Sequence, residues 1–485
     1  MSAEETRGGR AARPVAGRLS RRQFLHRAGA FGLGLAALPV LAACGNNGNA
    51  TATTAAGGGG AAGGTAVPGA TSPAAAGGSP AAAGGTPAAQ LKGAKVSLLL
   101  GSGFVKAADD MVGTLGKEWA KGVGADFTLQ IVNSNDLQSR AASAIQSGSG
   151  PDIITCQNNW PWLYEQNFVD VSSLAEALPK QGGAIYDILV TQSKVNGVWR
   201  GVPECITPNA IHWRTDYFKA NGYDKFPGTF DDWMTVGKKL KDYGKPYGAA
   251  AGHSYGDPKI MWYGVLWAFG GKEVEQDGKT VAINSPETQK ALEWASQFWK
   301  SACDEDGLSW DDSDNNTFYL AGKISATMNG SSIYLKAKTD KPDIAKNTAI
   351  FPYPKGPSGG NIINNTNTNA IPTYSKNQDA AKAFLTWFMD KPNFSRWLEA
   401  GGGYNTGPTK NYESSSIWTA DPKMKGFLEA AQNSRWIGWP APPSKETSES
   451  EGKFVIVDMF ARVFQGTAPK DSIAQAESAL KGIYK

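Results

Sequence analysis

The sequence predicts an α/β fold divided into two domains. Short runs of β-branched and apolar residues alternate with helical patterns from residue 95 onward. Such alternation is typical of a parallel sheet covered by helices. The part of the chain with this pattern, residues 92–485, is longer than one hydrophobic core usually serves. No sequence period of 20–50 residues is visible, which argues against a solenoid or a propeller.

The first 43 residues have the pattern of an export signal. A twin-arginine motif, SRRQFL, occupies residues 20–25 and is followed by an apolar, Gly/Ala-rich run over residues 28–43. The run ends in small residues before Cys44, as in a lipoprotein signal that is cleaved before an acylated cysteine. An uncleaved N-terminal anchor helix is the alternative. Both interpretations place the globular part outside the cytoplasmic membrane, and the first attaches it there through lipid on Cys44.

Residues 44–91 connect this signal to the globular part. Residues 45–90 contain no charged residue and consist almost entirely of Gly, Ala, Thr, Pro, Ser and Asn. Such a segment cannot bury enough apolar surface to offset its ordering entropy. We expect a flexible tether with a root-mean-square reach of roughly 35–40 Å.

Net charge and cysteine content exclude several classes of partner. The whole chain carries a formal charge of +4, and residues 1–43 hold seven Arg and two Glu, so their removal leaves 4 − 5 = −1. No basic patch for nucleic acid or acidic lipid is therefore expected. The remaining cysteines, Cys156, Cys205 and Cys303, match no zinc spacing. A disulfide between Cys156 and Cys205 and three buried thiols are the two alternatives.

The first domain begins with a clear order of elements. Strands are expected at 95–100, 127–132 and 152–155, with helices at 107–121 and 135–146 between them. Asn196 and Gly197 lie between two apolar segments and predict a hairpin. Further helices are expected near residues 229–244, 286–299, 379–389, 422–431, 454–465 and 471–484.

Polar and aromatic residues follow the expected strand at 152–155. Asn158, Asn159 and Trp160 combine amide groups with a flat apolar face. Open α/β sheets bind ligands beyond the carboxyl ends of their strands, and a small-molecule site needs both kinds of surface. This loop is therefore a candidate ligand site.

An ordered series of short motifs extends this interpretation. The series comprises GSGPDII at 148–154, NGVWRGVP at 196–203, WRTDYF at 213–218, PGTFDDW at 227–233 and FYLAGKISATMNG at 318–330. It resembles extracellular solute-binding protein family 1, the carbohydrate-binding receptors of ABC importers that are related to maltose-binding protein. Each motif is weak alone, but their order is specific and the resemblance spans residues 95–485.

The resemblance implies a two-lobed, type II periplasmic-binding-protein-like fold. Each lobe would hold a mainly parallel sheet covered by helices, and hinge strands would join the lobes. Lobe I would comprise residues 92–207 and 368–420, and lobe II residues 208–367 and 421–485. A ligand bound between hinged lobes favours their closure, which an ABC permease can detect. The receptor is expected to be a monomer.

A sugar requires hydrogen-bonding groups for its hydroxyls and aromatic faces for its C–H surface. Core packing is the alternative role for every aromatic candidate. For Trp310 a solvated loop before a strand at Phe318 is a further alternative. Asn159 and Trp160 stand where maltose-binding protein carries a charged rim, which argues against maltose and leaves mono- or oligosaccharides, polyols and glycosylated acids open. The candidate ligand residues are Ser102, Phe104, Asn158, Asn159, Trp160, Trp262, Tyr263, Trp310, Asn329, Ser331, Tyr404 and Trp436.

Nothing in the sequence supports catalysis directly. Neither a His-Glu-x-x-His nor a Gly-x-Ser-x-Gly motif is present, and no cofactor is expected. The acids at 311–314 lack the Gly and Glu of an EF-hand loop, so no metal is expected. Two alternatives stay open: a secreted polysaccharide-degrading enzyme, which needs only two carboxyls, and a carbohydrate sensor or adhesin without a transporter.

Overall fold

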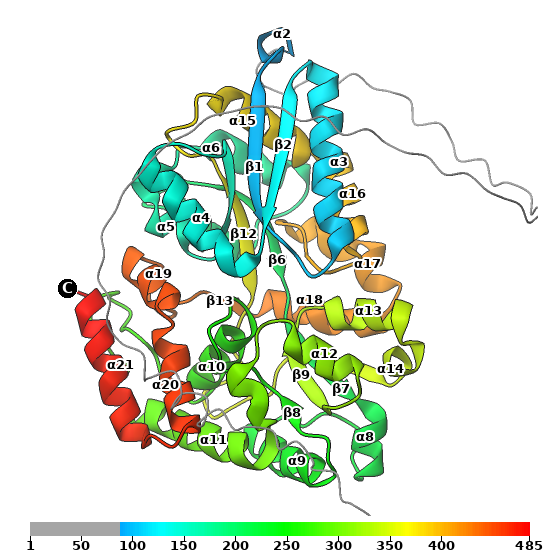
Figure 1. The fold of residues 1–485 in the computed structure, drawn as a ribbon, viewed down its shortest axis with the longest axis vertical. Coiled ribbons are helices and arrows are strands. Elements are labelled where there is room, and N and C mark those ends of the chain that lie inside the picture. The colour runs from blue at the N-terminus through cyan, green and yellow to red at the C-terminus, as the bar shows by residue number, and fades with distance from the viewer. Residues whose placement is uncertain (1–87) are drawn as a thin grey trace, which may run out of the picture. The chain divides into compact units, whose positions relative to one another are not determined.

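The described residues form two larger sheets and two sheets of two strands each, and the first larger sheet has five strands in the order β2-β1-β3-β12-β6 (Figure 1). A computed structural model describes residues 88–485, so the expected signal, Cys44 and residues 45–87 of the tether lie outside the described residues. β1, β2 and β3 are parallel, and β12 runs antiparallel to both β3 and β6. The strands are β1 (Lys95–Gly101), β2 (Asp126–Val132), β3 (Ile153–Gln157), β6 (Val202–Thr207) and β12 (Asn365–Ala370).

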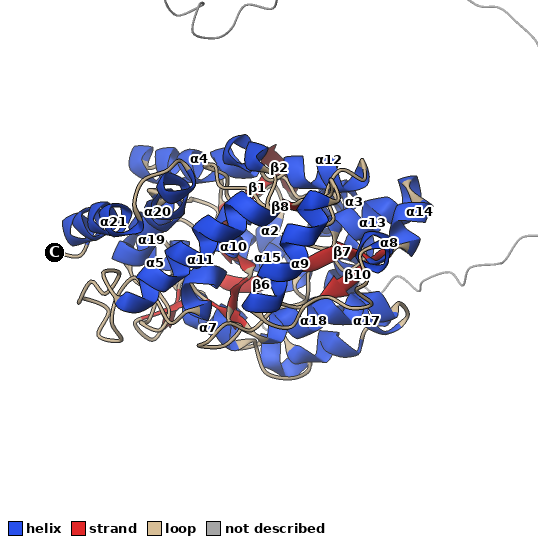
Figure 2. Ribbon diagram, turned by 90° about the horizontal axis from the view of Figure 1, so that it is seen from below, coloured by secondary structure: helices blue, strands red, loops and turns tan. Residues whose placement is uncertain are grey.

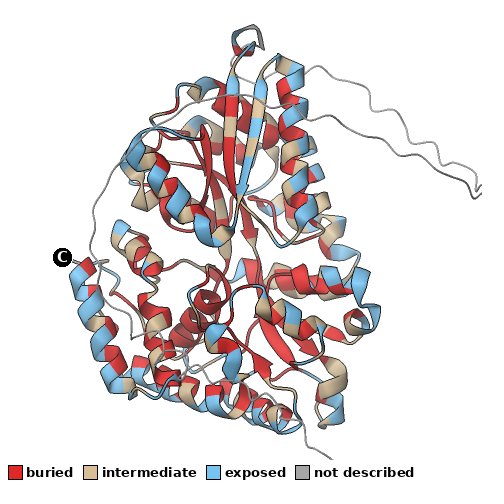
Figure 3. Cartoon of the chain, viewed as in Figure 1, coloured by how far each residue is buried: buried red, intermediate tan, exposed pale blue. Residues whose placement is uncertain are grey.

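Helices cover this first sheet and complete lobe I. Apolar residues of β1, α3, α15 and α16 form one continuous core around the sheet. β2 is an edge strand, and its residues are exposed or half-buried (Figure 3). The helices of this lobe include α3 (Lys106–Val123), α4 (Ser134–Ser147), α7 (Asp187–Ser193), α15 (Gln378–Phe388) and α16 (Lys391–Gly401).

The second sheet has the strand order β10-β7-β9-β8 and forms lobe II. β7 pairs antiparallel with β9 and β10, whereas β8 pairs parallel with β9. Helices lie outside the strands (Figure 2). The strands are β7 (Ala210–Arg214), β8 (Tyr247–Gly248), β9 (Ala326–Asn329) and β10 (Thr348–Phe351). The main helices are α9 (Phe230–Asp242), α10 (Asp257–Ala268), α11 (Pro286–Ala302), α20 (Val455–Phe464) and α21 (Pro469–Ile483).

Aromatic residues fill the core of lobe II. Phe298 stacks on Trp294, with ring centroids 4.7 Å apart. Trp299 stacks on Phe464 at 4.3 Å, which joins α11 to α20. Large aromatic side chains bury much apolar surface, and their pairs add a further gain beyond that area. The many Trp residues of the sequence therefore serve packing in this lobe.

Local sequence explains where the helices begin and end. Thr229 caps α9 and accepts a hydrogen bond from the backbone of Asp232, and Ser285 caps α11 in the same way. Gly148 ends α4 at φ 63°, a conformation that favours glycine. These capped helices match the expected positions closely.

Asn364 ties together three segments that pass between the lobes. Its side-chain oxygen accepts from the backbone of Asn209, 2.7 Å away, in the β6–β7 connection. Its nitrogen donates to the carbonyl of Ala430 at 2.8 Å and to the hydroxyl of Ser434 at 2.6 Å. Ala430 lies in α18 (Lys425–Gln432) on the third passage, and Ser434 follows this helix. Asn364 itself is fully buried.

The α/β class and most expected elements are confirmed. Parallel pairing holds for β1 to β3, while β7 has antiparallel neighbours. β3 continues to Gln157, two residues beyond the expected end. Phe318, expected in a strand, lies in α12 (Asp314–Leu320), because the preceding acidic segment turns into a helix.

The structure also bears on the disulfide that the sequence left open and on membrane-spanning helices. Cys156, Cys205 and Cys303 are all free and buried, so Cys156 and Cys205 form no disulfide here. Among residues 88–485 no helix combines the length and apolar character needed to cross a membrane.

Candidate ligand-binding site

A cavity of about 90 Å³ lies between the two lobes at the ends of β1, β3, β6 and β12. The loop before α10, the end of β9 and the turn at Tyr404 close it from the other side. We call this cavity the cleft. Its polar and aromatic lining residues are Ser102, Phe104, Asp109, Ser134, Gln157, Glu204, Thr207, Asn209, Tyr255, Asp257, Asp312, Asn329, Asn365, Asn367, Trp397, Tyr404 and Asn405.

Glu204 is a buried acid in the lobe I wall of the cleft. It lies in β6 and is 4% exposed. Its carboxylate accepts a hydrogen bond from the side-chain amide of Asn369 in β12 at 2.8 Å. Burial penalises the charged form and raises the pKa of Glu204 to about 7, although the Asn369 bond opposes the shift.

Asp312 shapes the lobe II wall. Its carboxylate accepts from the hydroxyl of Ser254 at 2.7 Å and from the backbone of Gly256 and Asp257, each at 2.8 Å. These bonds hold the turn that precedes α10, and this turn directs Tyr255 and Asp257 to the cleft. Burial, and next the neighbouring Asp312, raise the pKa of Asp257 well above its usual range.

Three residues that line the cleft each carry a buried polar atom without a hydrogen-bond partner. These atoms are Oε1 of Gln157, the hydroxyl of Tyr255 and Oδ2 of Asp257. Gln157 comes from lobe I, whereas Tyr255 and Asp257 come from lobe II. An unsatisfied buried polar group costs about 1–3 kcal/mol. A polar ligand that meets all three would recover this cost and connect the lobes.

Tyr404 supplies an aromatic surface between the lobes. A Cβ atom placed on Gly103 would lie 3.7 Å from its ring, and one placed on Gly330 would lie 3.2 Å from the opposite ring edge. Gly103 follows β1 and Gly330 follows β9, so the ring lies next to backbone of both lobes. Trp397, buried in α16, lies on the same lining.

The cleft lining is acidic. Besides Glu204, Asp257 and Asp312 it includes Asp109, which accepts from the backbone of Gly103 at 2.9 Å. Burial raises the pKa of Asp109 to about 6. None of the lining residues is Lys, Arg or His. Within residues 88–485, no three His, Cys, Asp or Glu side chains are grouped closely enough to hold a metal ion.

Four of the candidate residues from the sequence line the cleft. Ser102 and Phe104 follow β1, Asn329 ends β9, and Tyr404 lies in the turn after α16. Phe104 is 45% exposed, which is unusual for a phenylalanine and leaves its ring free at the cleft edge.

Asn158, Asn159 and Trp160, the leading candidates, do not line the cleft. Because β3 extends to Gln157, the chain turns away afterwards, and Asn158 adopts φ 48°. Asn158 donates to Glu451 at 2.8 Å, and Asn159 donates to the carbonyl of Ile437 at 2.9 Å. These residues pack against α19 (Lys445–Gly452) and are a contact between protein segments.

Four more candidates lie within the protein. Trp262 donates to the carbonyl of Ala250 at 2.9 Å, and Tyr263 donates to Glu273 at 3.1 Å. Both belong to α10, in which every residue is buried (Figure 3).

Trp310 and Ser331 also contact protein groups. Trp310 packs on Phe318 with ring centroids 4.6 Å apart. Ser331 is fully buried and donates to the carbonyl of Gly403 at 2.9 Å.

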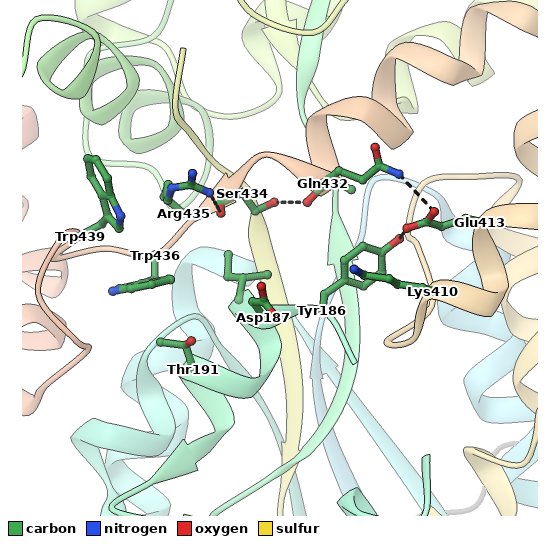
Figure 4. A pocket seen from close by; sticks show the side chains of 12 residues that line it. Tyr186, Asp187, Thr191, Lys410, Glu413, Gln432, Ser434, Arg435, Trp436 and Trp439 are labelled. Carbon is green, nitrogen blue, oxygen red and sulfur yellow. Dashed lines mark hydrogen bonds between the residues drawn. The ribbon is translucent and has the colours of Figure 1, made fainter. Parts of the chain in front are cut away.

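Trp436 lines a separate cavity of about 590 Å³ (Figure 4). This cavity shares no lining residue with the cleft. The figure shows Trp436 and Trp439 on one side, with Tyr186 and Glu413 on the other, joined by a hydrogen bond of 2.7 Å. Trp436 itself donates to the carbonyl of Ala441 at 2.6 Å.

Sequence reasoning missed several residues of the cleft. A lone acid in the otherwise apolar strand VPECIT was a signal for Glu204. The strand NTNTNA, polar yet mostly buried, was a signal for Asn365 and Asn367. Tyr255 and Asp257 gave no such signal, because Asp312, 55 positions after Asp257, fixes their turn.

Two α/β lobes with a polar cleft between them define a two-lobed solute-binding protein. Residues 101–393 match the model of the bacterial extracellular solute-binding protein family, and the chain belongs to this family. Members of this family are binding proteins located outside the cytoplasm.

Known proteins resemble the chain over most of its length. A probable ABC transporter-binding protein of Deinococcus radiodurans is 22% identical over 334 residues, which cover 65% of this chain and 77% of that protein. A solute-binding protein of Thermotoga lettingae TMO, solved with α-D-tagatose, has a TM-score of 0.71 and 18% identity, with 81% of this chain and 100% of that chain covered. A sugar transporter protein of Arthrobacter chlorophenolicus A6, solved with laminaribiose, has a TM-score of 0.70 and 17% identity, again with 81% of this chain and 100% of that chain covered.

Proposed function

We propose that this protein is the extracytoplasmic receptor of an ABC importer and captures a hydroxyl-rich sugar or polyol in the cleft. The observation that carries this proposal is the set of three buried, unpartnered polar atoms on Gln157, Tyr255 and Asp257. Tyr404 supplies the apolar face beside them. This combination of polar groups and an aromatic ring suits a sugar. The sugars bound by the similar structures support the same class of ligand.

Binding would be coupled to closure of the lobes. A ligand that satisfies Gln157 in lobe I and Asp257 in lobe II gains both contacts only when the lobes are close together. Its binding free energy therefore favours the closed state. The lobes of this proposal are residues 92–207 with 368–420, and residues 208–367 with 421–485. The permease would recognise the receptor with its two lobes closed.

The proposal also includes the export of the protein, its attachment to the membrane and its monomeric state. Residues 1–43 would direct export, by the twin-arginine route, and Cys44 would carry the lipid that attaches a monomeric receptor to the outer face of the membrane. The long uncharged segment before residue 91 supports this assignment, because it leaves the receptor free to move near the surface. Mass spectrometry of the exported protein would detect the lipid on Cys44.

We further propose that the protein does not act on its ligand. The carboxyl groups of the cleft would bind hydroxyls; a glycosidase would instead use two of them as acid and base or nucleophile. Incubation with oligosaccharides separates the two functions. Release of products would support the enzyme, whereas recovery of intact ligand with a raised melting temperature supports the receptor.

The decisive test is a thermal-shift screen of sugars and polyols, followed by calorimetry with Tyr255→Phe. Removing the unpartnered hydroxyl should weaken binding by about five-fold or more without lowering stability. Tyr243→Phe changes an exposed tyrosine in the same way and should leave affinity unchanged. If no sugar or polyol raises the melting temperature, the proposed substrate class is wrong.

A further inference from the structure

We propose that the cleft selects a ligand that carries a protonated amine beside its hydroxyl groups, and that Asp257 is the acceptor for this amine. The inference rests on the proposed function and names its substrate class more closely. An amino sugar or an amino alditol would then bind better than its neutral counterpart. The corresponding sugar acid would be rejected.

Charge is the first observation behind this proposal. Four carboxyl groups line the cleft, those of Asp109, Glu204, Asp257 and Asp312, and no cationic side chain lines it. Lys259, on the same helix as Asp257, is paired with Glu451 at 3.2 Å and is buried in that pair. Burying a carboxylate without a cation is costly. A ligand that brings its own positive charge would offset this cost.

The hydrogen bonds of the four carboxyl groups single out Asp257. Asp312 already accepts three bonds and Asp109 accepts one from Gly103. Glu204 accepts one from Asn369 and a weaker one from the thiol of Cys205. Asp257 is 7% exposed, and its Oδ2 atom accepts none. The amine should therefore bind at this oxygen.

The chemistry of the unpartnered atoms is the second, independent observation. Oε1 of Gln157 only accepts hydrogen bonds, and the hydroxyl of Tyr255 can accept them. Oδ2 of Asp257 becomes an acceptor only when Asp257 is ionised, and a bound cation favours this ionised form. The three atoms together require donors. An ammonium group supplies N–H donors and no acceptor, so it suits acceptor atoms such as these, whereas a carboxylate supplies no donor.

A metal ion fits the same residues poorly. The cleft carboxyls are not gathered into a group that could hold a metal within the described part of the chain. Two of them are already engaged by backbone N–H groups.

The test uses ligands that differ only in charge, with affinities measured by calorimetry at a pH where the amine is protonated. The first set is neutral sorbitol, cationic 1-amino-1-deoxysorbitol and anionic gluconate. The second set compares hexoses of several stereochemistries with their 2-amino, N-acetylated and uronic acid forms. We expect amines to bind about ten-fold tighter than neutral partners, and acids not to bind. The N-acetylated sugars, which keep the nitrogen but lose its charge, should lose the advantage.

Two results would overturn the proposal in different ways. If neutral ligands bind as tightly as amines, or more tightly, the amine preference is wrong and the receptor function stands. If no member of either set binds, the proposed function itself fails.

Asp257→Asn tests the assigned residue. It keeps the size of the side chain and removes its charge, so the variant should bind amine and neutral ligands with similar affinity while still binding the neutral ones. Asp126→Asn changes an exposed aspartate at the start of β2 and should keep the preference. An Asp257→Asn protein that still prefers amines by the original ratio would contradict the assignment.

Discussion

Asn158 of lobe I donates a hydrogen bond of 2.8 Å to Glu451, which belongs to the segment leading into the core of lobe II. The same carboxylate oxygen accepts from Lys259 of α10 at 3.2 Å. All three side chains are buried. One oxygen atom thus receives hydrogen bonds from the end of β3 in lobe I and from α10 in lobe II.

Asn158→Gly should weaken ligand binding by about ten-fold, since a hydrogen bond to a charged group contributes about 1.5–3 kcal/mol. Glycine tolerates the φ of 48° at this position, so the backbone can remain as it is. The matched control is Asn196→Gly, at φ 49° in the exposed turn between β4 (Lys194–Val195) and β5 (Val198–Trp199). Calorimetry measures the affinity, and equal loss in both variants would refute a role of the contact in closure.

Gly330→Leu should reduce ligand affinity by about 100-fold or more, equivalent to about 2.8 kcal/mol. A Cβ atom at this position already lies 3.2 Å from the Tyr404 ring, so a longer side chain must enter the cleft or displace the ring. Gly228→Leu is the control, because a Cβ atom there meets nothing within 4 Å. Unchanged binding by Gly330→Leu would show that the ligand site lies elsewhere.

Tyr263→Phe should lower the free energy of unfolding by about 1–3 kcal/mol, because the buried Glu273 loses one of its donors. Tyr484 still donates to the other oxygen of Glu273 at 3.0 Å. Ligand affinity should stay the same, since Tyr263 does not line the cleft. Urea unfolding and calorimetry measure the two quantities. A loss of affinity with unchanged stability would show that Tyr263 contributes to ligand binding.

His212 should make the protein less stable in acid. Burial lowers its pKa to about 3 in the folded state, whereas an unfolded histidine titrates near 6.5. Between these values the unfolded state binds more protons, so stability falls as the pH falls from 6.5 toward 3. Glu204 and Glu273 act in the opposite sense between about 4.5 and 7, because their pKa values are raised to about 7.

The variant His212→Phe isolates the contribution of this histidine. Its neighbours Tyr319 and Phe427 are aromatic, so a phenylalanine ring suits the site. The loss of stability between pH 7.5 and pH 4.5, measured by urea unfolding, should be smaller than in the unmodified protein. His253→Phe removes an exposed imidazole and serves as the control. An identical pH dependence in all three proteins would contradict this account of His212.

The sequence predicted the sheets and helices better than the ligand residues. β1, β2 and α3 were predictable because apolar spacing along a short segment decides them. Whether Asn158 faces a ligand depends on Glu451, 293 positions later. No local pattern carries such a contact.

The aromatic candidates show the same limit for a different reason. Trp262 and Tyr263 lie on a helix that is buried on all sides, so no polar face marked their environment. Tyr404 was predicted from its glycine-rich turn and does line the cleft. Glu204 was not predicted because ligand residues were expected in loops, whereas this acid lies within a strand.

The bonds of Asn364 to Asn209, Ala430 and Ser434 bear on how the lobes can rotate. Because one side chain fastens all three passages at a single point, we expect the passages to move together when the lobes rotate. Two fluorescent labels, one on each lobe, would then follow the same single coordinate wherever they are attached. A sensor built on this protein could therefore take its labels at exposed positions far from the cleft, such as Ile131 and Tyr243, without losing the signal of closure.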